Sequence, residues 1–225
     1  MQERIRIRKF GITEYTVAYS AMTRFNANRQ AHSVDELWCL QHAPVYTLGL
    51  AGRKEHILKY SEVPVVETDR GGQVTYHGPG QLVVYLLMDL KRKGLMVKQY
   101  VNLIEQSLID MCDTLAVPAS RKQAAPGVYV NKKKIASLGI RVKRGCAYHG
   151  LALNVAMDLA PFYNIHPCGF PGLTVTQLAD EGCQVDVHDA FDCLLPFLLT
   201  NLEYSYPEYL GNCASLSDMN NLLAA

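Results

Sequence analysis

Residues 127–155, GVYVNKKKIASLGIRVKRGCAYHGLALNV, decide the fold class of this chain. They contain three segments rich in β-forming residues, at 127–130, 134–142 and 147–155, joined by short polar turns. Short connections join antiparallel neighbours, since parallel strands need long crossovers. This stretch therefore predicts a largely antiparallel sheet.

The segments around this stretch add strands and a few well-separated helices. Four more segments are predicted as strands: residues 4–8, the segment 37–47 that ends in a turn, 64–68, and 81–89. Three segments have apolar residues at helical spacing: 15–25, 97–115, and 190–203, where Pro196 is a site for a kink. The pattern predicts an α+β fold with a mixed, largely antiparallel sheet flanked by helices, because regular strand–helix alternation is missing.

Length and composition restrict the class of protein. The 225 residues fit one domain, 1–225, and 49% of them are hydrophobic. The formal net charge of +1 does not suggest a general nucleic-acid binder. No apolar run reaches membrane-spanning length, and the N-terminus does not resemble a signal peptide. The seven cysteines form no C-x-x-C pair, so we expect reduced thiols, a cytoplasmic protein and no metal site.

The segment HPCGFPG at residues 166–172 is the first candidate site. Two prolines and two glycines around Cys168 exclude a regular helix or a central strand, so the thiol lies on a shaped loop. Loop side chains are often functional, but a free cysteine is also a common small core residue. Local sequence leaves both interpretations of Cys168 open.

A nucleophilic thiol needs an activating group, and Lys134 is a candidate. Ordinary thiols are mostly protonated near neutral pH, and an adjacent ammonium favours the thiolate. Lys132 and Lys133 fall at the predicted turn beside Asn131, where solvated charges are expected. Lys134 enters the following strand, ahead of small residues that leave room for a ligand. An exposed lysine at the strand edge is the alternative.

Two further stretches carry candidate binding residues. Residues 70–81, RGGQVTYHGPGQ, are rich in glycine, which permits close backbone approach to a ligand. They do not have the spacing of a phosphate-binding loop, and Gly78–Gly80 also fits a plain hairpin turn. Residues 148–154, YHGLALN, place His149 at the start of an apolar strand, where a structural, hydrogen-bonded histidine is the commoner case.

Together these stretches resemble the lipoyl (octanoyl) transferases. The resemblance rests on five motifs in family order between residues 42 and about 178: HAPVYTLG at 42–49, DRGGQVTYHGPGQ at 69–81, KIASLG at 134–139, HGLALN at 149–154, and PCG at 167–169. One such motif would be weak evidence, whereas five in order are specific. His166 is the one departure, and no role is assigned to it.

The resemblance implies a fold similar to the catalytic domain of lipoate and biotin protein ligases. It implies that Cys168 carries the acyl group as a thioester and that Lys134 tunes its thiol. By the same resemblance, three groups of residues line the acyl site: Arg70, Gly71, Gly72, Gln73, Val74, Thr75, Tyr76 and His77; Ser137, Leu138 and Gly139; Gly150, Leu151 and Ala152.

The implied reaction moves an octanoyl group from octanoyl-acyl carrier protein to a lysine of lipoyl domains, without cofactor or ATP. The acceptors implied are the lipoyl domains of 2-oxoacid dehydrogenase complexes and the glycine cleavage H protein, with no nucleic-acid or membrane partner. Two basic clusters, at 91–93 and 141–144, are candidates for docking an acidic carrier, or plain solvated faces.

An amidotransferase that relays octanoyl groups between lipoyl-bearing proteins differs from the implied reaction in its donor. Beside it, two alternatives remain. One is an ATP-dependent lipoate or octanoate ligase on the same fold, against which Cys168 argues, because an adenylate mechanism needs no thiol. The other is a non-catalytic protein that binds lipoyl domains or acyl carriers, which the presence of both Cys168 and Lys134 disfavours.

Overall fold

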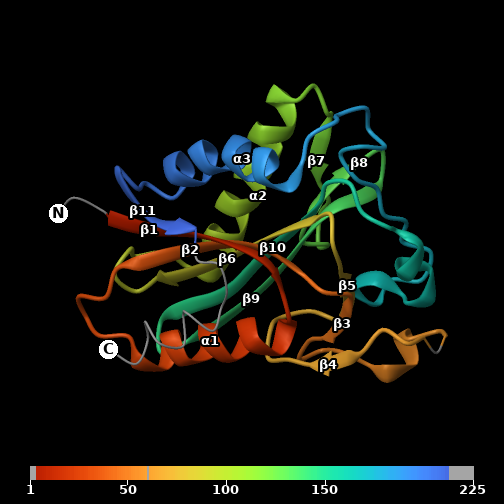
Figure 1. The fold of residues 1–225 in the computed structure, drawn as a ribbon, viewed down its shortest axis with the longest axis horizontal. Helices are drawn as coiled ribbons and strands as arrows, with labels where there is room; N and C mark the ends of the chain where they lie inside the picture. Colours follow the sequence, from red (N-terminus) through yellow and green to blue (C-terminus); the bar gives the residue numbers. More distant parts are fainter. Residues whose placement is uncertain (1–3, 60, 213–225) are drawn as a thin grey trace.

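The computed structural model describes residues 4–59 and 61–212, which form two β-sheets and three α-helices (Figure 1). The larger sheet has the strand order β11-β1-β2-β6-β10-β9-β8-β7, and the smaller has the order β4-β3-β5. Among the pairings of described residues, β1–β2, β1–β11 and β3–β4 are parallel and the other six are antiparallel. The predicted α+β class with a mixed, largely antiparallel sheet is confirmed.

The elements have the following bounds. The strands are β1 (Arg4–Thr13), β2 (Asp35–His42), β3 (Val45–Leu48), β4 (Val65–Glu67), β5 (Val74–His77), β6 (Gln81–Asp89), β7 (Ala119–Arg121), β8 (Val128–Val130), β9 (Lys133–Lys143), β10 (Cys146–Asn154) and β11 (Tyr206–Asn212). The helices are α1 (Tyr15–Asn28), α2 (Val97–Thr114) and α3 (Val187–Asn201), with short 3₁₀ turns η1 (Lys54–His56), η2 (Ala160–Asn164) and η3 (Pro167–Gly169).

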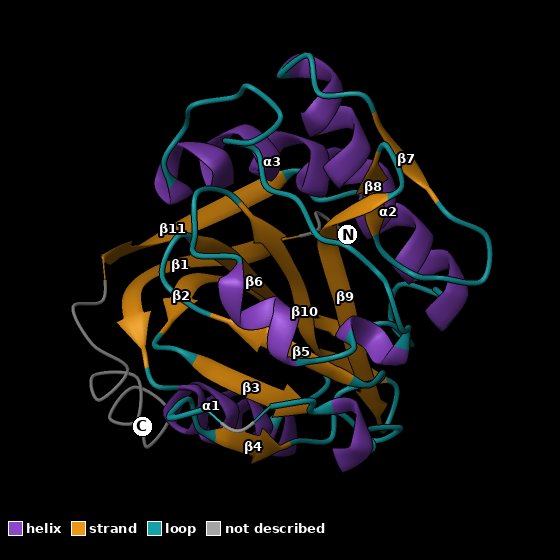
Figure 2. Cartoon of the chain, turned by 90° about the vertical axis from the view of Figure 1, so that its right-hand side faces the viewer, coloured by secondary structure: helices purple, strands orange, loops and turns teal. Residues whose placement is uncertain are grey.

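The large sheet is covered on both faces, as Figures 1 and 2 show: α2 and α3 lie on one face and α1 on the other. Successive side chains of β6 point to opposite faces, so Leu82, Val84 and Leu86 join the core beneath α2 and α3. Val83 and Tyr85 join the core on the α1 side. Burial on both faces explains why β6 reads as a continuous apolar run.

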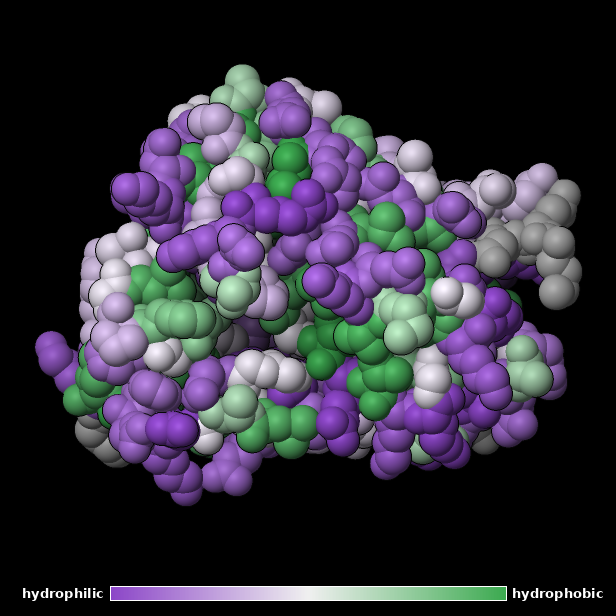
Figure 3. All heavy atoms as spheres, turned by 180° about the vertical axis from the view of Figure 1, so that it is seen from behind, coloured by the Kyte–Doolittle hydropathy of each residue, from purple (hydrophilic) through white to green (hydrophobic). Residues whose placement is uncertain are grey.

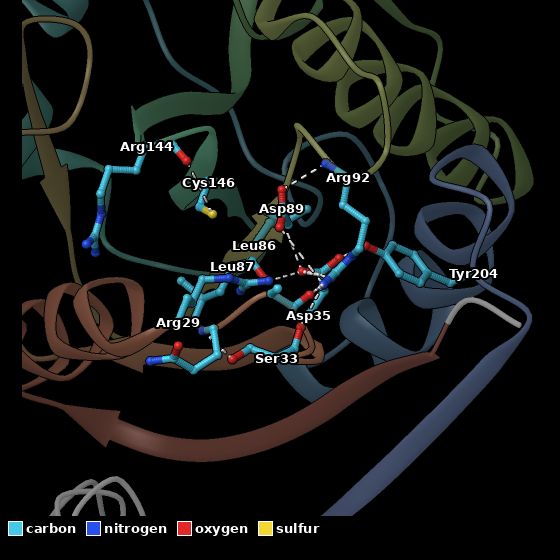
Figure 4. Close-up of polar contacts among 12 residues, drawn as sticks. Arg29, Ser33, Asp35, Leu86, Leu87, Asp89, Arg92, Arg144, Cys146 and Tyr204 are labelled. Carbon is cyan, nitrogen blue, oxygen red and sulfur yellow. Dashed lines mark hydrogen bonds and ion pairs between the residues drawn. The ribbon is translucent and has the colours of Figure 1, made fainter. Parts of the chain in front are cut away.

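A buried charge cluster lies at one end of the large sheet (Figure 4). It joins β2 to the end of β6 and to the residues that follow α1 and α3. The Asp35 carboxylate on β2 accepts hydrogen bonds from the guanidinium groups of Arg29 and Arg92, at 2.8 Å from the latter, and from the Tyr204 hydroxyl at 2.6 Å. The backbone N–H of Asp89 donates to the same carboxylate at 2.9 Å. Full pairing is what allows a carboxylate to be buried here.

Most predicted elements are present, and three differences have physical reasons. The glycine-rich residues 70–80 contain a strand, β5, which pairs with β3 in a second sheet. The predicted strand at 37–47 is two strands, because the chain leaves the large sheet after His42 and enters the small one at Val45. The segment after α3 forms an edge strand, β11, parallel to β1, which no local pattern predicted.

The helices lie close to their predicted positions. Helix α3 begins at Val187, earlier than predicted, because the Asp186 side chain caps the backbone N–H groups of His188 and Asp189. It continues through Pro196. Among the residues that the structure describes, no helix is both long and apolar enough to cross a membrane.

Seen from behind, the surface is mainly hydrophilic, with hydrophobic areas gathered around a hollow (Figure 3).

Candidate active site

Lys134 and Cys168 are in direct contact, although they lie 34 residues apart in the chain. The Nζ atom of Lys134 lies 3.0 Å from the Cys168 Sγ atom and also donates to the Pro126 carbonyl at 3.0 Å. Lys134 is only 3% exposed, whereas Cys168 is half-buried. The ammonium is thus held against the sulfur, while the sulfur stays accessible.

The chain that follows Cys168 brings the two residues together. Val175 forms a parallel bridge with Lys134 at the start of β9. The Lys134 N–H donates to the Thr174 carbonyl at 2.9 Å, and the Thr176 N–H donates back to the Lys134 carbonyl at 2.9 Å. On the other side of the loop, the His166 N–H donates to the His56 carbonyl at 2.8 Å. The Cys168 loop is therefore anchored at both ends.

Cys168 has a left-handed backbone conformation, with φ 56° and ψ 17°. This conformation is unusual for a residue with a side chain, and such residues gather at functional sites. The turn is closed by the Gly169 N–H, which donates to the His166 carbonyl at 2.8 Å. Gly169 itself lies against Gln73, since an added Cβ would come within 2.8 Å of the Gln73 side chain. Only glycine at 169 lets the loop pack this closely.

The charge state of Lys134 follows from its surroundings. Burial alone would lower the pKa of Lys134, but attraction to the Cys168 sulfur and its hydrogen bond outweigh burial and raise that pKa above 10.5. The Tyr129 ring, whose centroid lies 5.2 Å from Nζ, adds a cation–π contact. Lys134 is therefore an ammonium at neutral pH.

A cavity with about 510 Å³ of empty space, part of it open to solvent, begins at Cys168. Twelve of the fourteen predicted acyl-site residues line it. They are Arg70, Gly72, Gln73, Val74, Thr75, His77, Ser137, Leu138, Gly139, Gly150, Leu151 and Ala152. Four more lining residues were not among those predicted: Tyr15, Val83, Tyr85 and His149.

Strands β9, β10 and β6 are neighbours in the large sheet (Figure 2). Small residues in register across them leave the space for this cavity. One row runs from Ser137 on β9 through Ala152 on β10 to Val83 on β6. The next row places Gly139 opposite Gly150. A side chain at Gly150 would collide with the Val84 carbonyl, since an added Cβ would lie 2.0 Å from that oxygen.

Arg70 is a buried cation that holds the glycine-rich segment in place. Its guanidinium donates to the Thr47 hydroxyl at 2.8 Å and to the carbonyls of Thr47 and Gln73, both at 2.7 Å. Burial lowers the pKa of Arg70, an effect that Tyr15 and Cys168 oppose. No carboxylate pairs with Arg70 among the described residues, and its nitrogens donate instead to hydroxyl and carbonyl oxygens beside the cavity.

The two exceptions among the predicted residues take part in packing. Tyr76 points away from the cavity into the core beside the small sheet, where its ring lies 5.5 Å from the rings of Tyr46 and Phe162. Its position on β5, a strand that alternates faces, explains why Thr75 and His77 reach the cavity and Tyr76 does not. Val74 also lines the cavity, although it packs in the same core as Tyr76. Gly71 lies behind the cavity, where its N–H donates to the Ile140 carbonyl at 3.1 Å.

His149 lies in the wall of the cavity and is hydrogen-bonded, as a structural histidine would be. Its Nε2 lies 2.9 Å from Asp69 Oδ1, and the Tyr148 hydroxyl donates to the other oxygen of that carboxylate. Burial lowers the pKa of His149, although Asp69 acts in the opposite direction. The hydrogen bonds from His149 and Tyr148 outweigh burial and lower the pKa of Asp69 to about 2.

Among the lining residues not predicted, Val83 and Tyr85 gave only a partial signal in the sequence. Both lie on β6 two residues apart and share a face, but an all-apolar strand does not reveal which face meets a cavity. Tyr15 begins α1 and reaches the cavity only through the packing of α1 on the sheet. Its position depends on tertiary structure alone.

The chain is similar to known proteins over most of its length. The lipoyl protein ligase A/B catalytic domain matches residues 14–198. An octanoyltransferase of Nitrosococcus oceani is 48% identical over 205 residues, which cover 91% of this chain and 92% of the relative. An octanoyltransferase of Stutzerimonas stutzeri is 50% identical over 211 residues, 94% of this chain and 96% of the relative.

Solved structures of ligases share the fold at low sequence identity. A bipartite lipoate protein ligase from Thermoplasma acidophilum, studied with its E2 lipoyl domain, superposes with a TM-score of 0.72 at 14% identity, covering 100% of this chain and 92% of that one. A biotin protein ligase from Aquifex aeolicus superposes with a TM-score of 0.53 at 14% identity, covering 90% of this chain and 71% of that one. The predicted likeness to both ligase folds is confirmed. With relatives near 50% identity over nearly its whole length, this chain belongs to the octanoyltransferases, a family of acyltransferases with the lipoyl protein ligase A/B catalytic domain.

Proposed function

We propose that this chain takes an octanoyl group from octanoyl-acyl carrier protein onto Cys168 as a thioester, and then passes it to a lysine of a lipoyl domain. The observation that carries the proposal is the 3.0 Å contact between Lys134 Nζ and Cys168 Sγ at the mouth of an apolar cavity. An ammonium at this distance stabilises a thiolate, the nucleophilic form of cysteine.

The first half-reaction exchanges one thioester for another. The Cys168 sulfur forms a bond to the acyl carbon as the bond to the carrier's sulfur breaks, and the departing thiolate takes up the proton that the Cys168 thiol lost. The raised pKa of Lys134 supports an ammonium that stabilises the thiolate, in preference to a neutral amine that acts as a base. Lys134 then also offers positive charge to the oxygen of the tetrahedral intermediate.

The second half-reaction makes an amide. The neutral amine of the acceptor lysine attacks the acyl carbon, the bond to Cys168 breaks, and a proton from the amine restores the thiol. An amide is more stable than a thioester, so the step needs no ATP. Division of one transfer into two predicts ping-pong kinetics, in which the carrier leaves before the lipoyl domain reacts.

The remaining parts of the proposal concern setting and partners. We propose that a single domain, 1–225, carries both half-reactions, without cofactor or metal, in the cytoplasm, where the thiol that the reaction needs stays reduced. We propose lipoyl domains of 2-oxoacid dehydrogenase complexes and the glycine cleavage H protein as acceptors. Support for a lipoyl-domain acceptor comes from the Thermoplasma acidophilum ligase of the same fold, which was studied with such a domain.

Mass spectrometry of the intact protein after mixing with octanoyl-carrier protein tests the proposal. We expect an octanoyl adduct that hydroxylamine removes and that maps to Cys168. Cys168→Ser should lose turnover, and an ester trapped on that serine would still support the position. The proposal fails if the wild-type protein forms no adduct and octanoylates lipoyl domains only when ATP and free octanoate are supplied, because that is the behaviour of a ligase.

A further inference from the structure

A second hollow meets the Cys168 thiol from outside the acyl cavity. This outer groove encloses about 820 Å³ of space that opens to solvent. It lies between the first turn of α2, the loop before β8, the start of β9 and the Cys168 loop. Val97 and Phe170 on its rim are 47% and 49% exposed, and Lys134 is the one charged residue among its lining. Exposed apolar residues around a reactive thiol indicate a ligand-binding surface.

The outer groove and the acyl cavity share a wall. Gly72, Leu138, Gly139 and Cys168 line both. A thioester carbonyl bound at Cys168 carries two substituents, the acyl tail and the departing sulfur with its arm. With the tail in the inner cavity, the geometry leaves the outer groove for the arm of the departing thiol.

The charge at the outer end of this groove identifies the arm. The groove continues into a neighbouring hollow through Ala124, Ala125 and Phe170, which line both spaces. Lys122 and Lys132 line that neighbouring hollow, and neither lining contains an aspartate or glutamate. An apolar passage that ends in two lysines fits an extended chain with an anionic group at its far end.

We propose that the outer groove binds the pantetheine arm of the acyl donor, with the arm's phosphate beside Lys122 and Lys132. The inference rests on the proposed function, since it names the path of the leaving thiol in the first half-reaction. An arm in the groove occupies the approach to the thioester, so the acceptor lysine enters only after the arm has left. This order agrees with ping-pong kinetics.

The two basic clusters noticed in the sequence lie elsewhere. The Lys91 N–H donates to the Gly145 carbonyl, so residues 91–93 and 141–144 are neighbours at the far end of β9. Lys143 is nine residues along the strand from Lys134, roughly 30 Å at 3.3 Å per residue. Arg92 and Arg144 also bond within the protein, to Asp35 and to the carbonyls of Asn26 and Ala27. Lys122 and Lys132 are better placed to meet a donor arm at Cys168.

Octanoyl thioesters with arms of three lengths test the inference: N-acetylcysteamine, pantetheine and 4′-phosphopantetheine. The readout is kcat/KM for formation of the octanoyl adduct on Cys168. In the wild-type protein we expect kcat/KM to rise with arm length. Val97→Trp, which fills the groove from an exposed helix end, should lower the ratio of pantetheine to N-acetylcysteamine donor about fivefold.

The role of the positive charges on Lys122 and Lys132 is tested separately. The double variant Lys122→Glu/Lys132→Glu should lower the ratio of phosphopantetheine to pantetheine donor about tenfold, since it replaces two attractive charges by repulsive ones. Lys133→Glu is the matched control, because Lys133 is exposed, adjacent in sequence and outside both linings. It should keep the wild-type ratio, and thermal unfolding should show that all variants fold.

The outcomes separate the inference from the function on which it rests. If all three donors acylate Cys168 with equal kcat/KM, or if neither ratio changes in the variants, the groove does not bind the arm and the thioester mechanism stands. If no donor acylates Cys168, the proposed function fails and the inference fails with it.

Discussion

Three features of the chain place Cys168 on a shaped loop against Lys134. The prolines and glycines around it exclude regular structure, the turn gives it a left-handed backbone, and the bridge at Val175 brings it to Lys134. The buried Arg70 faces the same cavity. Of these two cations, Lys134 is the one in direct contact with the sulfur.

Lys134→Met tests the dyad at the scale of one residue. Methionine fills the same buried space without charge, so the fold should survive while acylation at neutral pH falls roughly a hundredfold. Because the pKa of Lys134 is raised, its charge is present below 10.5 and is lost only as pH rises through the raised value. The contribution of this charge to acylation should therefore be lost only in that alkaline range.

Single-turnover acylation measured across pH checks this prediction. The variant should acylate more slowly than the wild-type protein at every neutral pH, since its thiol lacks the adjacent cation. Lys133→Met, on the exposed neighbour, is the matched control and should behave as wild type. Full activity of Lys134→Met at neutral pH would remove the dyad from the mechanism.

At the scale of elements, the register of β6, β10 and β9 determines the shape of the acyl cavity. Pairing aligns small residues in rows, so that three strands that are otherwise tightly packed leave a hollow on the α1 side. A slip of one residue in β10 would turn Leu151 and Leu153 toward that side and fill it. The shape of the cavity therefore depends on the register in which β6, β10 and β9 pair.

Ala152→Leu tests whether this row limits acyl length. The larger side chain removes space from the cavity, so octanoyl should lose more binding energy than hexanoyl, at about 0.8 kcal/mol per CH₂ displaced. We expect the ratio of kcat/KM for hexanoyl over octanoyl donors to rise about tenfold. Competition between the two donors measures that ratio directly.

Val83→Ala is the matched opposite change in the same row and should shift the preference toward longer chains. Thermal unfolding identifies any loss of fold in either variant. Unchanged preferences in both folded variants would mean that the acyl tail lies elsewhere.

At the scale of the whole molecule, three histidines are buried where α1 and the small sheet meet the large sheet. His42 Nδ1 lies 2.8 Å from the Thr13 carbonyl, to which it donates, and its Nε2 accepts from the Tyr85 hydroxyl at 2.6 Å, an arrangement of the neutral ring. Burial lowers the pKa of His42 to about 4, and burial also lowers the pKa values of His77 and His149. The fold therefore favours neutral histidines.

This burial predicts loss of stability in mild acid. For His42 the folded pKa of about 4 lies below the ordinary 6.5, so its contribution is present above 6.5 and is lost as pH falls toward 4. As pH falls from neutrality to about 5, the lowered pKa of His42 alone should reduce the free energy of unfolding by about 2 kcal/mol. The lowered pKa values of His77 and His149 act in the same direction. Asp69, with a pKa of about 2, should contribute only at lower pH.

Urea unfolding at a series of pH values measures this dependence. His42→Gln should reduce the slope of the unfolding free energy against pH, whatever its effect on stability at neutral pH. His32→Gln, at an exposed turn, should keep the wild-type slope. Equal slopes in wild type and His42→Gln would show that His42 does not titrate in this range.

The sequence alone determined the fold class, most strands, all three helices, and the motifs that contain Cys168, Lys134 and Arg70. These features depend on local periodicity and on short motifs, and both can be recognised in the amino-acid sequence without knowledge of the fold. Only the tertiary structure decided that Lys134 touches Cys168, that Tyr76 faces away from the cavity, and that β11 pairs with β1. Contacts between distant segments depend on strand register and on the packing of elements, which no local pattern encodes.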